Sequence, residues 1–380
     1  MTEPNAYSVR TVRSIDELSS IRDEWQRFQQ HPNTDYDFYK LIVDVRDEVI
    51  SPYVLVVEAE GAVISILAAR LEAATIEYKI GYRVITRAHV RSITVLQAGL
   101  LGHVDLAVCT ALVNALKEAL AAKEASVVRF GFMPIDSCLF QVCKARVCRL
   151  RFSFGSGISE HFRVVLPSSP EEFAKRLKPK HRQTVRRYQN KLKRDYGNVE
   201  LRFVGEYTEI DRLCDDVESV ACKTYQRRIG VGFVDNREWR SRLRLLAEKR
   251  ALFAQILYVA EVPRAFVLIT IYKGVAYLDD TGYDPELSRY GVGTALHLKA
   301  IETLCRNEIT RLDFGSGYAE YKQRFGNESW PEASFSICGP TIEAFSVTLI
   351  HSLLGSANRI GKQLADSVGL LNRIKKSSRS

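Results

Sequence analysis

The sequence lacks the features that define several classes of protein. It has no run of the roughly 18–20 apolar residues that a membrane-spanning helix needs, and Met1–Arg10 lacks the basic head and apolar stretch of a signal peptide. Its 22 Gly and 11 Pro are few and dispersed, which excludes collagen-like and low-complexity proteins. None of its eight Cys forms a CxxC pair, and the series Cys138, Cys143 and Cys148 lacks the spacing of a zinc site. We therefore expect a cytoplasmic globular protein with reduced thiols and no metal.

The composition that remains is typical of a soluble globular chain. Hydrophobic residues make up 46% of the 380 positions, and charged residues make up 26%. A single hydrophobic core rarely grows beyond about 250–300 residues, so the length predicts two or three domains.

One segment holds the excess positive charge. From Phe173 to Gly197 the chain has ten Lys and Arg against the single Asp195, a net charge of +9 that equals that of the whole chain. Ser169 opens a capping box with Pro at the first helical position, and a second helix start follows at Pro179. A dense cationic helix suits a polyanion such as nucleic acid, a nucleotide pyrophosphate, an anionic glycan or a membrane surface. A solvated helix face is the alternative explanation.

Two stretches of the chain predict the same order of elements. The first order is helix, hairpin, helix, strand and helix, over 14–28, 53–71, 105–123, 127–132 and 135–144. The second stretch repeats it with an added helix, over 209–226, 239–248, 254–273, 275–280, 293–306, 311–314 and 318–324. We expect an α/β fold with two similar units, 1–165 and 166–340, followed by a helical tail with a basic terminus, 341–380.

A glycine-rich turn opens the helix at 293–306. Gly291 and Gly293 let the backbone approach a ligand, and the free N–H groups of the first helical turn attract an anion. A pyrophosphate fits such a turn, with Arg289 as an additional charge and Thr294 as a hydroxyl donor. An ordinary tight turn would explain the same glycines.

Acidic and phenolic side chains follow the ends of two predicted strands. Asp279 and Asp280 are adjacent on one strand, so only one of them can face a given cleft. Asp313 lies within an apolar strand and therefore needs a salt-bridge partner or a ligand amine. Tyr321 could protonate a leaving thiolate, since its usual pKa near 10 suits a thiol product. Solvation of the acids and packing of Tyr321 on the sheet are the structural alternatives.

The motifs together resemble a known family. Its pattern is matched by Gly282-Tyr-Asp-Pro, Tyr290-Gly-Val-Gly-Thr-Ala-Leu296, Asp313-Phe-Gly315 and Tyr321-Lys-x-x-Phe325, and by the basic segment Leu177–Arg187. The chain resembles the cellulose-biosynthesis-associated (CelD/BcsL-like) acyltransferases of the GNAT acetyltransferase superfamily, which are related to the Fem-type aminoacyltransferases.

The resemblance implies two tandem GNAT-like units, with mixed sheets flanked by helices and paired as in Fem enzymes. It also implies acyl-CoA as cosubstrate. The cofactor turn of the superfamily usually reads Gln/Arg-x-x-Gly-x-Gly/Ala, whereas Ser288 stands at its first position here and Arg289 comes one residue late. The first unit lacks the second glycine in 100–105 and has Arg129 where the second unit has Asp313. The second unit is therefore expected to be catalytic and the first a degenerate partner.

The resulting hypothesis is direct transfer of an acyl group from acyl-CoA to an amine or hydroxyl. Asp280 or Asp313 would be the base and Tyr321 the acid. The resemblance points to an anionic glycan or nucleotide sugar in envelope or exopolysaccharide metabolism. The residues expected to bind this acceptor are Arg182, Arg186, Tyr283 and Lys322.

Three alternatives remain open at this point. A Fem-like enzyme would take an aminoacyl group from tRNA and would bind RNA in a salt-sensitive way. A non-catalytic module would use the basic helix to bind a polyanion and would not bind CoA. Peripheral association with the inner membrane face is an alternative to a freely cytoplasmic protein.

Overall fold

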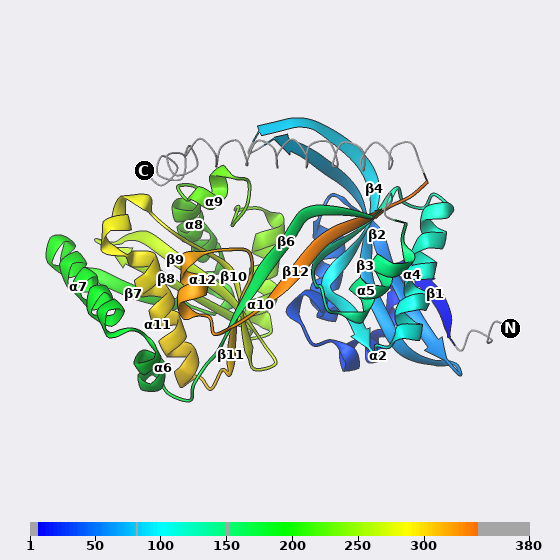
Figure 1. Ribbon diagram of the computed structural model, residues 1–380. Coiled ribbons are helices and arrows are strands. Elements are labelled where there is room, and N and C mark those ends of the chain that lie inside the picture. Colours follow the sequence, from blue (N-terminus) through cyan, green and yellow to red (C-terminus); the bar gives the residue numbers. More distant parts are fainter. Residues whose placement is uncertain (1–6, 81–82, 149–151, 341–380) are drawn as a thin grey trace, which may run out of the picture. The chain divides into compact units, whose positions relative to one another are not determined.

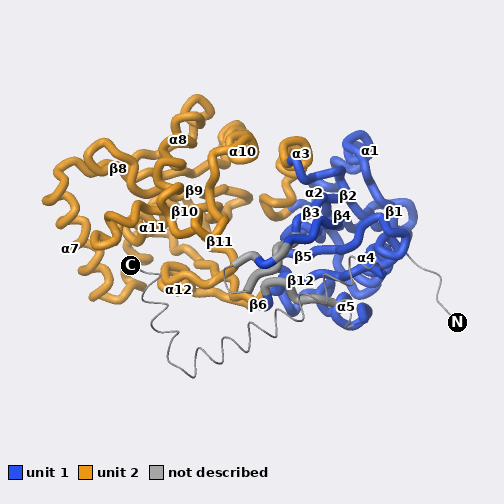
Figure 2. The backbone as a smooth tube through the Cα atoms, turned by 90° about the horizontal axis from the view of Figure 1, so that it is seen from above, with its two compact units in different colours: residues 1–29, 47–158, 333–380 blue, residues 30–46, 159–332 orange. Residues whose placement is uncertain are grey.

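The computed structural model describes residues 7–80, 83–148 and 152–340. The described chain divides into two compact units (Figure 2). Unit 1 contains residues up to 29, residues 47–158 and those from 333 onward, whereas unit 2 contains residues 30–46 and 159–332. We expected a boundary between residues 165 and 166. The sequence did not indicate that residues 30–46 belong to unit 2 or that residues 333–340 belong to unit 1. The expected helical tail, 341–380, lies outside the described residues.

Unit 1 has strands in the hydrogen-bonded order β1-β2-β3-β4-β5-β12. The pairs β1/β2, β2/β3 and β3/β4 are antiparallel, and β4/β5 is parallel. The elements are β1 Ser8–Val12, α1 Ile15–Ser19, α2 Arg22–Phe28, β2 Val49–Ala59, β3 Ala62–Ile80, β4 Arg83–Gly102, α4 Leu106–Ala121, β5 Val127–Pro134, α5 Cys138–Arg146 and β12 Glu328–Cys338, whose first residues up to Glu332 lie in unit 2.

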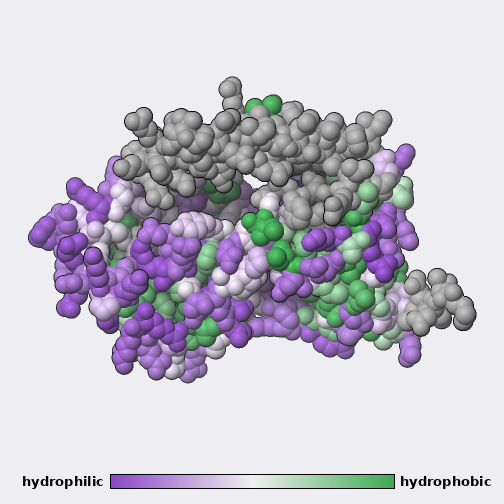
Figure 3. All heavy atoms as spheres, in the orientation of Figure 1, coloured by the Kyte–Doolittle hydropathy of each residue, from purple (hydrophilic) through white to green (hydrophobic). Residues whose placement is uncertain are grey.

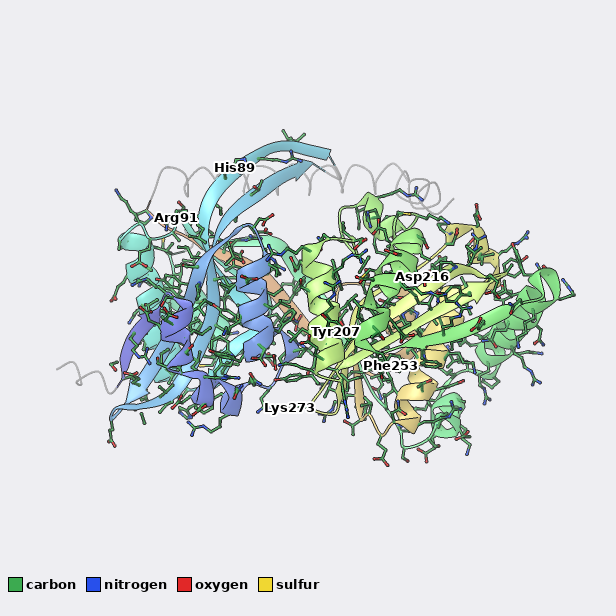
Figure 4. All side chains as sticks on the ribbon, turned by 180° about the vertical axis from the view of Figure 1, so that it is seen from behind. His89, Arg91, Tyr207, Asp216, Phe253 and Lys273 are labelled. Carbon is green, nitrogen blue, oxygen red and sulfur yellow. The ribbon has the colours of Figure 1, made fainter. Side chains whose placement is uncertain are left out.

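Local sequence signals explain most of the helices in unit 1. Asp105 caps α4 by accepting the N–H of Val108 at 2.7 Å, and its apolar face is buried against the sheet. The expected helix over 14–28 is instead two helices, because the hydroxyl of Ser20 donates to the carbonyl of Glu17 where α1 ends. Strand β4 was not assigned from the sequence; Figure 4 labels two of its exposed polar residues, His89 and Arg91.

Unit 2 has strands in the order β6-β11-β10-β9-β8-β7. Its strands are β6 Phe152–Val165, whose last residues from Ser159 lie in unit 2, β7 Val199–Val204, β8 Leu252–Val259, β9 Val262–Tyr272, β10 Val275–Tyr283 and β11 Arg311–Ser316. Its helices are η1 Pro32–Thr34, α3 Tyr36–Val45, α6 Pro170–Arg176, α7 Pro179–Tyr196, η3 Tyr207–Glu209, α8 Ile210–Ala221, α9 Tyr225–Arg228, α10 Arg237–Glu248, η4 Pro285–Tyr290, α11 Val292–Arg306 and α12 Glu320–Phe325.

Helices cover both faces of the sheet in unit 2 (Figure 1). Alternate residues of β9 belong to different cores: Val267 packs with α6, α7, α11 and α12, whereas Phe266 and Leu268 pack with α8 and α10. Strands buried on both faces read as continuous apolar runs, which is why β8 and β9 were predictable from the sequence. Among the described helices, none has the length and apolarity needed to cross a bilayer.

Strands β10 and β11 open a wedge at their carboxyl ends. They pair in parallel only from Val275 opposite Arg311 to Tyr277 opposite Asp313, although both continue beyond this point. A bulge in β10 at Leu278–Asp280 and one in β11 at Asp313–Gly315 shift each strand relative to its other neighbour. The carboxyl ends of parallel strands are common ligand sites, so the wedge positions the candidate site.

Candidate active site in unit 2

Asp280 lies in β10 beyond the last residue that pairs with β11, where the wedge opens. The carboxylate of Asp280 accepts the backbone N–H of Thr281 at 2.8 Å and that of Phe233. Burial raises the pKa of Asp280 to about 6, despite these two hydrogen bonds. Burial also raises the pKa of Tyr321, and the negative charge of Asp280 adds to that effect. The neighbouring Asp279 is bound instead by Arg242 and by the hydroxyl of Thr270. The bulge at Leu278–Asp280 interrupts the regular alternation of β10 here, because it places Asp280 opposite Leu268, on the same face of β9 as Thr270.

His297 supports Tyr321 from α11. The two rings are stacked with centroids 4.3 Å apart. Nδ1 of His297 donates to the carbonyl of Gly293 at 2.8 Å, and burial lowers the pKa of His297 to about 4. The imidazole is therefore neutral at pH 7, and its Nε2 has no hydrogen-bond partner within the described structure.

Asp313 is engaged by a buried histidine. Nε2 of His161 lies 2.7 Å from the carboxylate of Asp313, and Nδ1 lies 3.0 Å from that of Glu332. Burial alone would lower the pKa of His161, but the hydrogen bonds to both acids outweigh this effect and raise the pKa to about 9. The imidazolium of His161 thus neutralises Asp313. It is the salt-bridge partner that the sequence required for this acid. The ring of His161 also stacks on Trp330, with centroids 4.3 Å apart.

The same histidine does not form a nucleophilic triad with Ser316. The hydroxyl of Ser316 is 3.4 Å from Nδ1 of His161, but it donates to Glu332. Because both ring nitrogens face carboxylates, His161 carries two protons and has no lone pair to accept one from Ser316. This cluster therefore ties β6, β11 and β12 together rather than generating a nucleophile.

Lys322 and Tyr283, two of the residues expected to bind the substrate, differ in exposure. The ammonium group of Lys322 is buried and donates to the carbonyls of Gly315 and Ser316 at 3.2 and 2.8 Å. Burial lowers its pKa to about 8, although the charge of Asp313 opposes the shift. Tyr283 is 42% exposed, and its ring lies against Gly293, where a Cβ would come within 2.9 Å of it. A side chain at position 293 would therefore clash with the ring of Tyr283, in addition to disturbing the turn.

A cationic groove of about 380 Å³ opens at the start of α11. Gly291 caps the helix with a left-handed φ of +59° and offers no side-chain cap, so the first N–H groups of α11 have no side-chain acceptor. The groove is lined by residues of α7, α11 and α12, together with the residue that precedes α7: Lys178, Lys180, His181, Thr184, Val185, Tyr188, Gly291, Thr294 and Arg324. Cations and a helix N-terminus therefore converge on one cavity, which is an anion-binding arrangement.

The other predicted cations lie outside this groove. Arg289 donates to the hydroxyl of Tyr290 at 2.9 Å, and that hydroxyl donates to Asp195 at 2.9 Å, which fastens the end of α7 to η4. Arg182 and Arg186 are exposed on α7. Neither has an ion-pair partner among the described residues. The surface over α7 is correspondingly hydrophilic (Figure 3).

The structure thus brings some predicted residues together and separates others. Asp280 is near enough for its charge to raise the pKa of Tyr321, and Gly291 and Thr294 both line the groove, whereas Asp313 is held by His161. Sequence reasoning did not assign roles to Lys178 and Lys180, which belong to the basic segment, or to His161, whose partners are more than 150 residues away. Within the described chain, no group of His, Cys, Asp and Glu side chains is arranged to hold a metal ion.

Comparison with known proteins agrees with this geometry. Residues 179–323 match the family described as acetyltransferase (GNAT) domain. This part of the chain is therefore similar to a GNAT acetyltransferase domain, which supports an N-acyltransferase. The match begins at the first residue of α7 and ends within α12, so it contains the wedge and all the residues of the groove except Lys178 and Arg324. No curated protein matches the sequence.

Solved structures share the fold over most of the chain. The chain superposes on FemX with a TM-score of 0.56 at 11% identity, covering 90% of this chain and 100% of the other. A tandem GNAT protein from the clavulanic acid pathway gives 0.51 at 12% identity, with coverage of 88% and 99%. The C-terminal domain of a putative lysylphosphatidylglycerol synthetase from Agrobacterium fabrum gives 0.51 at 11%, with coverage of 87% and 94%. At such low identity, the structural similarity shows the fold alone. It confirms the predicted tandem GNAT-like fold.

Proposed function

We propose that unit 2 transfers an acyl group from an acyl-CoA thioester to an amine or hydroxyl of an anionic acceptor. The observation that carries this proposal is the cationic groove at the N-terminus of α11. Most of its lining lies within the segment that matches the GNAT acetyltransferase domain, a family that generally uses acyl-CoA.

The groove has the chemistry that CoA phosphates require. The N–H groups of the first turn of α11 supply donors that no side chain caps, and Lys178 and Lys180 supply positive charge that no described acid neutralises. Arg324 adds a third cation, which is shared with Glu320. Arg289, expected from the sequence to bind the pyrophosphate, is proposed instead to support the groove by fastening α7 through Tyr290.

The wedge supplies the groups for the transfer itself. The acceptor attacks the thioester carbonyl, a new C–N or C–O bond forms, and the C–S bond breaks. Asp280 takes the acceptor proton, since a carboxylate with a pKa near 6 is ionised at pH 7 and remains basic enough to serve. Asp313 is the weaker candidate, because its charge is compensated by His161.

Tyr321 is proposed to assist the leaving thiolate by a hydrogen bond. Its raised pKa keeps the phenol protonated, but it also makes full proton transfer to sulfur unfavourable. Solvent then supplies the proton that converts the thiolate to a thiol. The neutral His297 behind the ring orients Tyr321 without adding charge.

The acceptor is proposed to contact the outer face of α7 and the ring of Tyr283. Arg182 and Arg186 are exposed cations on α7, suited to the anionic groups of a glycan or nucleotide sugar, the class that the CelD/BcsL-like resemblance suggests. Lys322 is not part of this proposal, because its ammonium group is committed to backbone carbonyls.

Calorimetry with CoA tests the donor assignment. Thr294→Glu places a negative charge in the groove and should weaken CoA binding by about tenfold or more. Thr310→Glu is the matched control, since Thr310 is exposed and does not line the groove. Equal CoA affinity in the two folded variants would show that the groove is not the donor site.

A further inference from the structure

The segment 225–234, here called the apolar loop, exposes an unusual set of side chains. Four large apolar residues are 39–53% exposed: Tyr225, Ile229, Val231 and Val234. Within the described residues, no other stretch of ten exposes four such side chains. Single exposed apolar residues are normal on a protein surface, but a contiguous group marks an interaction site. The loop begins with α9, beside α8 (Figure 1).

The loop is anchored beside the catalytic wedge. Phe233 is 1% exposed, and its N–H donates to the carboxylate of Asp280. The side-chain amide of Gln226 donates to the carbonyl of Thr281 at 3.1 Å. Arg227 bridges Glu218 and the carbonyl of Phe233 at 2.6 and 2.7 Å. The exposure of the outer side chains is therefore a property of an ordered turn.

Several backbone N–H groups of the apolar loop are hydrogen-bonded within the loop or to the residue before it. The N–H groups of Ile229, Gly230 and Val231 donate to carbonyls of residues 225–227 at 3.0–3.3 Å. The N–H of Arg227 donates to the hydroxyl of Thr224. An amide without a partner is costly in an apolar medium, so a turn that pairs these groups internally is suited to contact lipid.

The charge at the tip of the loop fits a lipid head group. Arg228 is exposed and has no ion-pair partner among the described residues. Aliphatic side chains, a tyrosine and an adjacent cation are the combination found where proteins enter the interface of an anionic bilayer. We propose that the apolar loop docks on the surface of an anionic lipid bilayer, with Arg228 on a head group.

Docking would bring the wedge to the bilayer. Because Phe233 joins the loop to Asp280, the carboxylate would face an acceptor carried at the lipid surface, such as an amine or hydroxyl on a lipid head group or lipid-linked glycan. This last step rests on the proposed acyltransferase function, whereas the docking itself does not.

Sedimentation with lipid vesicles tests the docking. The full chain is mixed with vesicles of phosphatidylglycerol and phosphatidylcholine at physiological and at high salt. Replacing Ile229 and Val231 by Asp should reduce the bound fraction by about tenfold at both salt concentrations, because the apolar contribution is not screened. Val262→Asp is the matched control, since Val262 is 42% exposed in the hairpin of β8 and β9.

A second pair of variants separates the loop from the basic helix. Arg182→Glu with Arg186→Glu should weaken only the salt-sensitive part of binding. Val231→Trp reports insertion directly, since its fluorescence should shift to the blue when vesicles are added. Wild-type protein that stays in the supernatant, a double Asp variant that sediments like wild type, or an unshifted spectrum would each overturn the docking. CoA calorimetry on the same samples tests the proposed function independently.

Discussion

Asp313 lies 2.7 Å from Nε2 of His161, whereas Asp280 is hydrogen-bonded by two backbone N–H groups. The two acids look alike in the sequence, since each lies in a predicted strand that is otherwise largely apolar. In the structure, one is neutralised by an imidazolium and the other keeps its charge in a buried site. We therefore expect replacement of Asp280 and replacement of Asp313 to have different effects.

Asp280→Asn is expected to lower kcat by about 10²–10⁴-fold while leaving CoA affinity unchanged, because the amide keeps the shape and loses the base. Steady-state kinetics and calorimetry on one preparation measure both quantities. A variant with wild-type kcat would contradict the assignment of Asp280 as base.

Asp313→Asn is expected to act mainly on stability. Removing one partner of a buried ion pair typically costs about 3–5 kcal/mol, and His161 would retain only Glu332. Urea denaturation of the variant should show this loss, with any decrease in kcat smaller than that of Asp280→Asn. The reverse ranking, with stability intact, would make Asp313 the base.

The stability of unit 2 should depend on pH through His161. Its folded pKa of about 9 is above the unfolded value of about 6.5, so its contribution is complete below pH 6.5 and is lost as the pH rises through 9. His161→Gln should remove this slope between pH 6.5 and 9. His297 is the matched comparison, because its folded pKa of about 4 makes its contribution disappear as the pH falls from 6.5 toward 4. Denaturation at several pH values distinguishes the two.

The outer arginines of α7 should affect binding and not folding. Arg182 and Arg186 are exposed, so replacing both by Glu should barely move the melting temperature but raise KM for an anionic acceptor. A large loss of thermal stability would show that these arginines support the fold.

Some parts of this site were predictable because they depend on residues that are close together in the sequence. The helix α11 was expected from Gly293 and begins at Val292, because a glycine turn and an apolar stripe mark its start. The basic segment predicted α7 and its cation-rich surface. The wedge could not be predicted, since it depends on two bulges and on β6, which pairs with β11 from about 150 residues away. The partner of Asp313 was missed for the same reason, because only the fold brings His161 to it.

Tyr321→Phe tests how the leaving group is stabilised. Because burial and the charge of Asp280 raise the pKa of this phenol, we expect it to donate a hydrogen bond to sulfur rather than a proton. Its loss should lower kcat by about tenfold, the value of one hydrogen bond to a charged group, which is less than the loss of the base. The ring of the Phe variant can keep its stacking on His297.

A donor with a more acidic thiol distinguishes this role from a structural one. An aryl thioester releases a thiolate that needs little stabilisation, so wild type and Tyr321→Phe should turn it over at nearly equal rates. The difference should return with an alkyl thioester such as acetyl-CoA. If the two donors show the same loss, Tyr321 acts by positioning the site, and the thiolate is stabilised by other groups or by solvent.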